Sequence, residues 1–88
     1  MTTRFRTNID CAKKFMSDIS EQSILPAVGD LITVHKTSEI EINMPVIQRT
    51  WIFPEYKNPV LICELGLPPY FKDIRIFEDF LWSKGYRW

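Results

Sequence analysis

Few side chains in this 88-residue chain could do acid–base or nucleophilic chemistry. His35 is the only histidine, and the two cysteines, Cys11 and Cys63, lie far apart in the sequence. A general base needs a nucleophile or an orienting group within hydrogen-bond reach, and Cys63 is predicted to face away from both its neighbours in a strand. A small Cys–His enzyme is therefore only a third hypothesis, and we assign no catalytic residue.

Metal and cofactor sites are not indicated by the sequence either. One histidine and two separated cysteines cannot complete a four-ligand zinc site, and adjacent carboxylates such as Glu78 and Asp79 diverge on a helix. A phosphate loop needs a glycine-rich turn before a helix, whereas the three glycines of this chain are solitary. We predict no metal and no cofactor, and we interpret the protein as a binding module rather than an enzyme.

The first candidate binding feature is the apolar stretch 42–53. Arg49 and Trp51 share one face if this stretch is a strand. If that face is open, an arginine beside an aromatic ring, with Lys57 nearby, can stack single-stranded bases. If the face is covered, Trp51 fills the core between sheet and helices. Arg49, Trp51 and Lys57 are the predicted site of the alternative function, which is single-stranded nucleic-acid binding.

The second candidate feature is the aromatic C-terminus, because 10 of the 12 aromatic residues lie from Trp51 onward. Exposed apolar area beyond roughly a few hundred Å² usually marks an interface, and one small sheet cannot hide all of these rings. Alternatively, the last two aromatic side chains fold back and close the core. The predicted protein-binding site consists of Trp82, Tyr86 and Trp88, with Tyr70 and Phe71 in the preceding loop.

Composition and charge restrict the function further. Eleven basic residues balance eleven acidic ones, which argues against non-specific binding of phosphate backbones. No stretch approaches the roughly 18 apolar residues of a membrane span, and the N-terminus lacks the apolar segment of a signal peptide. We therefore predict a cytoplasmic protein with no membrane partner, in which both cysteines are reduced thiols.

Five elements must position these residues. Residues 8–24 are predicted to form a helix, because apolar side chains recur at helical spacing, and Pro26 ends it. Residues 31–36, 42–53 and 60–65 are predicted strands with connections too short for parallel crossovers. Pro45 marks an edge, a bulge or a kink in the second strand. Asp73 is predicted to cap a last helix that ends at Gly85.

The predicted fold is therefore α+β, with α-β-β-β-α order and a three-stranded antiparallel sheet that carries both helices on one face. We expect residues 1–88 to form a single small domain, since a second core cannot be built from so short a chain. The leading functional hypothesis is a non-catalytic protein-interaction or regulatory module. Its partner would be another protein or a second copy of the chain in a homodimer.

Overall fold

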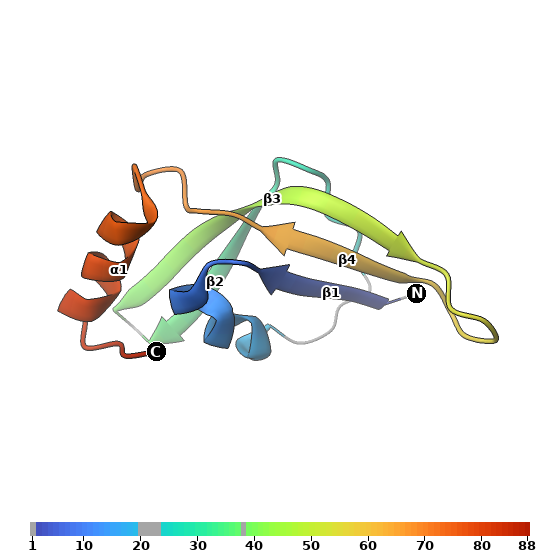
Figure 1. Ribbon diagram of the computed structural model, residues 1–88, viewed down its shortest axis with the longest axis horizontal. Helices are drawn as coiled ribbons and strands as arrows, with labels where there is room; N and C mark the ends of the chain where they lie inside the picture. Colours follow the sequence, from blue (N-terminus) through green and yellow to red (C-terminus); the bar gives the residue numbers. More distant parts are fainter. Residues whose placement is uncertain (1, 20–23, 38) are drawn as a thin grey trace.

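The computed structural model of the protein describes residues 2–19, 24–37 and 39–88 (Figure 1). The predicted strands and the C-terminal helix are present, and a further strand precedes them. No helix in these three ranges is long and apolar enough to cross a membrane. The elements are strands β1 (Thr2–Thr7), β2 (Leu31–Thr37), β3 (Ile40–Ile52) and β4 (Val60–Leu65), the 3-10 helix η1 (Asp10–Asp18) and the α-helix α1 (Ile74–Ser83).

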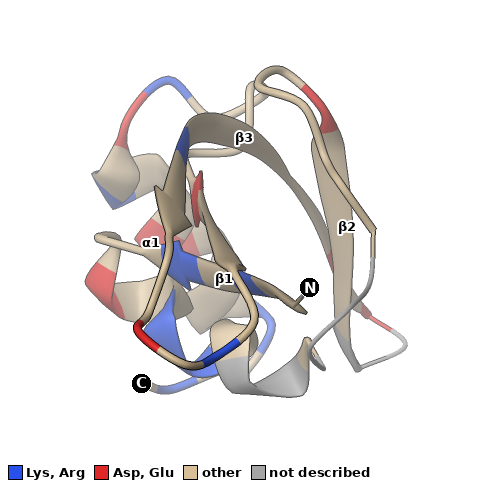
Figure 2. Ribbon diagram, turned by 90° about the vertical axis from the view of Figure 1, so that its right-hand side faces the viewer, with Lys and Arg blue, Asp and Glu red and all other residues tan. Residues whose placement is uncertain are grey.

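The four strands form one mixed sheet in the order β1-β4-β3-β2. Strand β3 pairs antiparallel with both β2 and β4, whereas β1 pairs parallel with β4. The predicted α-β-β-β-α order with a three-stranded antiparallel sheet is therefore wrong. The sheet is curled, and β3 arches between β1 and β2 (Figure 2). A parallel pair is possible here because η1, β2 and β3 supply the long connection that it requires.

Strand β1 was missed because its partner lies more than fifty residues away in the sequence. Its alternation of threonine and phenylalanine with arginine does fit a strand with one covered face. The guanidinium of Arg6 lies 3.4 Å from the carboxylate of Glu64 on β4. The buried hydroxyl of Thr7 donates to the carbonyl of Leu65 at 2.9 Å. These cross-strand contacts join a polar hexapeptide to the sheet.

The predicted first helix is a shorter 3-10 helix, η1, so the prediction of an α-helix over 8–24 is wrong in both type and length. Residues 20–23 of that range lie outside the described part of the chain. The buried side chains Ile9, Ala12 and Phe15 recur every three residues, which matches the three residues per turn of a 3-10 helix. Helix η1 contacts both β1 and β2 and brings Phe15 into the core.

The irregularity predicted at Pro45 is confirmed. The N–H of Val46 donates to the carbonyl of Asp30, just before β2, at 2.8 Å. Backbone N–H groups alternate in direction along a strand, so the nitrogen of Pro45 points away from β2. The proline therefore leaves no hydrogen bond to β2 unmade. The carbonyl of Pro45 instead accepts from the N–H of Gly66 at 2.9 Å. The register between β3 and β4 shifts between Val46 and Gln48, and this bulge places Ile47 outside the regular alternation.

Helix α1 lies at one end of the sheet (Figure 1). The signals predicted for its start, Asp73, and for its end, Gly85, are both confirmed. The carboxylate of Asp73 accepts from the N–H of Ile76 at 2.9 Å, as expected of an N-cap. At the other end Gly85 has a φ of +83°, and the N–H of Tyr86 donates to Leu81 at 3.0 Å. This is the Schellman arrangement, and it turns the chain so that Tyr86 stacks on Phe15 with ring centroids 4.7 Å apart.

Replacing Gly85 with alanine is expected to lower the free energy of unfolding by about 1 kcal/mol, because an L side chain resists a left-handed φ. A Cβ at this position would meet nothing within 4 Å, so the cost is purely conformational. Asparagine tolerates this region better than alanine, and Gly85→Asn is the matched control. Urea unfolding of the two variants measures the difference, and equal stability would contradict the explanation.

Candidate binding surfaces

The titratable groups do not form a nucleophilic pair. His35 is exposed, and its Nε2 lies 4.0 Å from the carboxylate of Glu41 on the neighbouring strand. Cys11 and Cys63 are free thiols and are buried. Burial raises the pKa of the Cys11 thiol to about 11, with the negative charge of Glu78 adding to the effect. Burial also raises the pKa of Cys63, although the charge of Arg49 acts in the opposite direction.

A raised pKa keeps a thiol protonated, and the protonated thiol is a poor nucleophile. We therefore expect neither cysteine of the folded protein to be alkylated by iodoacetamide near pH 8, whereas both react after denaturation. At pH 9 the difference should widen for Cys11, because its thiol ionises near its usual pKa of 9.0 only in the unfolded chain. Mass spectrometry counts the labels. Rapid labelling of the folded protein would revive the Cys–His enzyme hypothesis.

Metal-ligating side chains are dispersed over the described residues. Among them, no group of three histidine, cysteine, aspartate or glutamate side chains could hold a metal ion.

Three aromatic residues of the predicted protein-binding site, Trp82, Tyr86 and Trp88, lie close together near the C-terminus. The rings of Trp82 and Trp88 meet edge to face at 5.7 Å, and Tyr86 lies 6.4 Å from Trp88. The guanidinium of Arg87 sits 3.6 Å above the ring of Trp82 and donates to the carbonyl of the same residue at 2.8 Å. We call Trp82, Arg87 and Trp88 the C-terminal cluster.

The two tryptophan rings of the C-terminal cluster are held in place by contacts within the chain and are also exposed to solvent. Trp82 is 54% exposed and Trp88 is 37% exposed, although both rings are held by intramolecular contacts. Tyr86 is only half-buried and stacks on the core residue Phe15. The structure therefore separates these residues: Tyr86 folds back onto the core, whereas the two tryptophans keep much of their surface outside it.

The other two residues of the predicted site belong to a separate aromatic group. Phe71 is half-buried and stacks on Phe77 at 5.1 Å, so it extends the core toward the start of α1. Tyr70 is exposed, and its hydroxyl accepts from the N–H of Asn43 on β3 at 3.3 Å. The loop before α1 and the chain end lie at opposite ends of the helix (Figure 1). Tyr70 and Phe71 are therefore not part of the C-terminal cluster.

The residues of the predicted nucleic-acid site lie on the β3–β4 hairpin, which projects from the body of the molecule (Figure 1). Trp51 is 41% exposed and lies 6.1 Å from the ring of Phe53, with an angle of 21° between the planes. Arg49 and Lys57 are exposed as well. Trp51 pairs with the buried residue Leu61 in the sheet register, so it lies on the same side of the sheet as Leu61 but leaves much of its ring uncovered.

The tip of this hairpin is apolar beyond the predicted residues. Phe53 is 74% exposed and Tyr56 is 96% exposed. Ile52, which follows Trp51 and points to the other side of the strand, is also exposed. We define the hairpin tip as Trp51, Ile52, Phe53 and Tyr56. Strand β1 pairs with β4 alongside Trp51 and Ile52, but much of the apolar surface of the hairpin tip is exposed, and exposed apolar surface is unfavourable in water.

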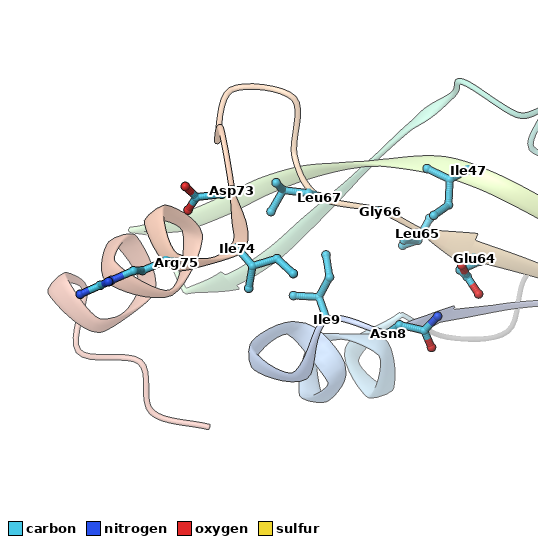
Figure 3. Close-up of a pocket in the computed structure, with 10 residues that line it drawn as sticks. All are labelled: Asn8, Ile9, Ile47, Glu64, Leu65, Gly66, Leu67, Asp73, Ile74 and Arg75. Atoms are coloured by element: carbon cyan, nitrogen blue, oxygen red, sulfur yellow. The ribbon is translucent and has the colours of Figure 1, made fainter.

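A groove of about 650 Å³ lies between the start of α1, the end of β1 and the bulge of β3 (Figure 3). Its apolar walls converge from four separate segments (Figure 3). The polar lining residues are Asn8 and Glu64 at one end and Asp73 and Arg75 at the other, and the side chains of Asp73 and Arg75 point away from the groove (Figure 3). The apolar lining residues are Ile9, Ile47, Leu65, Gly66, Leu67 and Ile74.

Sequence reasoning missed this groove, because its walls come from segments separated by more than sixty residues. The bulge at Ile47 creates one wall, and the side chain of Ile47 lies directly over Gly66. The sequence offered one relevant signal, which is Pro45 followed by the apolar residues Val46 and Ile47. This pattern predicts an irregular strand, but it does not predict a cavity. The groove has the size and the apolar lining that ligand sites of proteins commonly have.

The chain matches no known protein family, no curated protein and no solved structure.

Proposed function

We propose that the protein is a non-catalytic interaction module that binds a protein partner through the C-terminal cluster. The observation that supports this most directly is the pairing of order with exposure in Trp82 and Trp88. Side chains that are already held in place lose less conformational entropy when a partner covers them. Tryptophan and arginine are also the residue types most enriched among those that dominate binding energy.

The contacts of Arg87 support the same proposal. Its guanidinium stacks on Trp82 and donates to two backbone carbonyls, those of Trp82 and Tyr86. The charge is therefore fixed over an aromatic ring at the surface, and Lys84 lies above Phe80 on the same helix at 5.9 Å. Such a basic and aromatic surface favours a partner segment that offers apolar side chains together with a carboxylate.

The test compares proteins captured from an extract of the source cells by the wild type and by the double variant Trp82→Ala/Trp88→Ala. We expect a partner that the wild type retains and the variant loses. With that partner purified, calorimetry should show a dissociation constant raised at least about 30-fold, since truncating a dominant contact costs about 2 kcal/mol or more.

The matched control is Trp51→Ala, which removes a similarly exposed tryptophan from a distant part of the fold. It should retain the partner with unchanged affinity. Circular dichroism and urea unfolding must show that both variants are folded. Identical captured proteins from the wild type and the double variant would overturn the proposal.

A second candidate function, single-stranded nucleic-acid binding, is favoured by one observation. The nearly parallel rings of Trp51 and Phe53, beside exposed Arg49 and Lys57, provide stacking surfaces next to positive charge. Fluorescence anisotropy with a labelled oligothymidylate at low salt tests it. Binding should weaken steeply as salt rises, because phosphate contacts release counterions. Trp51→Ala should weaken it further, and an absence of binding at low salt would remove this candidate.

A further inference from the structure

The hairpin tip lies at one end of the molecule. The protein measures 46 × 21 × 19 Å, and the β3–β4 hairpin projects along the longest of these dimensions, with α1 at the opposite end (Figure 1). In the described part of the chain β1 begins at Thr2, which pairs with Val60 on β4. The turn at residues 53–59 therefore extends past the three-stranded part of the sheet, and a flat surface that approaches from this end meets the turn first.

The apolar side chains of the tip point in several directions. Trp51 and Phe53 lie on one side of the strand with their rings 6.1 Å apart, and Ile52, 46% exposed, lies on the other. Tyr56 is 96% exposed at the turn and holds a left-handed φ of 64°, where glycine is more favourable. A protein groove or a stacked base covers mainly one side of such an element, whereas the interfacial layer of a lipid bilayer surrounds an element that enters it. Tryptophan and tyrosine are also the residue types enriched in that layer.

The backbone of the turn is partly satisfied within the chain. Pro54 and Pro59 have no N–H to satisfy. The N–H of Lys57 donates to the carbonyl of Pro54 at 3.4 Å, and the carbonyl of Pro59 accepts from the N–H of Thr2 at the same distance. Unpaired backbone groups are costly where water is scarce, so this turn enters the interfacial layer more easily than a turn with a donor at every residue.

The charges at this end complement an anionic surface. Residues 2–4 and 49–60, which lie at this end, contain three basic residues and one acidic residue, whereas the whole chain has eleven of each. These four residues are all exposed, and they are Arg4, Arg49, Lys57 and Glu55. Each lysine or arginine close to an anionic bilayer adds to the attraction, so the excess of positive charge draws this end toward it.

We propose that the hairpin tip binds the surface of an anionic phospholipid bilayer and inserts its aromatic side chains into the interfacial layer, with Arg49 and Lys57 against the headgroups. This inference goes beyond the proposed function and does not rest on it, because it uses a surface far from the C-terminal cluster (Figure 1). The prediction of no membrane partner rests on the absence of a spanning stretch, which contact at the surface does not require. A few inserted side chains give weak and reversible binding.

The first measurement is the partition of the intact wild-type protein between buffer and lipid vesicles, determined by sedimentation. We expect binding to vesicles of phosphatidylcholine with about 30% phosphatidylserine and weaker binding to phosphatidylcholine alone, because the anionic lipid attracts the basic residues. Fluorescence then locates the contact. The variant Trp82→Phe/Trp88→Phe leaves Trp51 as its only tryptophan. Its emission should shift to shorter wavelength on the anionic vesicles and should be quenched by lipids brominated in their acyl chains.

Two variants separate insertion from charge. Phe53→Ser/Tyr56→Ser removes two exposed rings and should lower the partition coefficient at least about 10-fold on both kinds of vesicle, since apolar burial contributes on either. Arg49→Gln/Lys57→Gln should lower it about 10-fold on the anionic vesicles and leave the weaker binding to phosphatidylcholine unchanged. The control Val28→Ser alters an exposed apolar side chain in the turn before β2 and should change neither value. Circular dichroism must show that each variant is folded.

Several outcomes would overturn the proposal. These are a wild type that stays in the buffer at millimolar lipid, a tip variant that binds as well as the wild type, and an unshifted emission of Trp51. Binding that disappears completely at high salt would also overturn it, by showing adsorption to headgroups without insertion. Binding of oligothymidylate by a wild type that does not bind vesicles would assign the tip to nucleic acid instead. The variant Trp82→Ala/Trp88→Ala should bind vesicles normally, so failure of this proposal is distinguishable from failure of the proposed function.

Discussion

Replacing Phe15 with alanine is expected to lower the free energy of unfolding by about 3–5 kcal/mol, the usual cost of deleting a buried phenylalanine. Phe15 is fully buried, and it is the residue of η1 on which Tyr86 stacks. The variant therefore leaves a cavity and also removes the contact that joins the chain end to the core. A domain of this size has roughly 5–10 kcal/mol of stability in total, so the variant should be close to unfolding at room temperature.

Urea unfolding monitored by tryptophan fluorescence and by circular dichroism measures this loss. The matched control is Tyr56→Ala, which removes a large aromatic side chain that is 96% exposed and should change the stability by about 0.5 kcal/mol or less. A loss of under about 1 kcal/mol in Phe15→Ala would contradict the burial of η1 against the sheet. It would also contradict the attachment of the chain end to this helix.

Replacing Gly66 with alanine is expected to lower the free energy of unfolding by about 1–3 kcal/mol, the range for overpacking a close contact. A Cβ at position 66 would approach Cγ2 of Ile47 to 2.7 Å, which is closer than two carbon atoms can pack. Either Ile47 or the backbone of β4 must move. Since Ile47 forms a wall of the groove, this variant should also disturb the groove.

A double-mutant cycle identifies the contact responsible. Ile47→Ala removes the Cγ2, Cγ1 and Cδ1 atoms that the new methyl group would meet. The double variant Gly66→Ala/Ile47→Ala should therefore lose less stability than the sum of the two single variants, with a coupling of about 1 kcal/mol or more. Strictly additive losses would show that Ile47 does not lie over Gly66 in solution.

Much of the C-terminal half could be predicted from the sequence. Helix α1 follows its Asp73 cap and ends just before Gly85, and the strand over residues 60–65 lies where the pattern predicted it. These features depend on short-range physics, namely side-chain capping, a left-handed glycine and the β-branched composition of a short apolar run. Pro45 also predicted an irregularity in its strand, and the bulge follows it directly, between Val46 and Gln48.

Residues 2–19, which form β1 and η1, could not be predicted in the same way. The segment of β1 is polar, and its strand pairing depends on Arg6 meeting Glu64 and on Thr7 meeting Leu65 across the sheet. The spacing of Ile9, Ala12 and Phe15 fits both a 3-10 helix and one face of an α-helix. Local propensity does not decide whether these residues form a strand, a 3-10 helix or an α-helix. The apolar surface that each of these conformations buries depends on which strand lies beside the segment.

The candidate surfaces divide along the same line. The sequence by itself determined the chemistry available to the protein: balanced charge, an isolated histidine, two separated cysteines and an excess of aromatic residues toward the C-terminus. Only the tertiary structure decided which rings belong to the core and which remain exposed, with Tyr86 on Phe15 but Trp82 and Phe53 largely open. It also created the groove, because a recess built from four distant segments exists only when the sheet curls and brings them together.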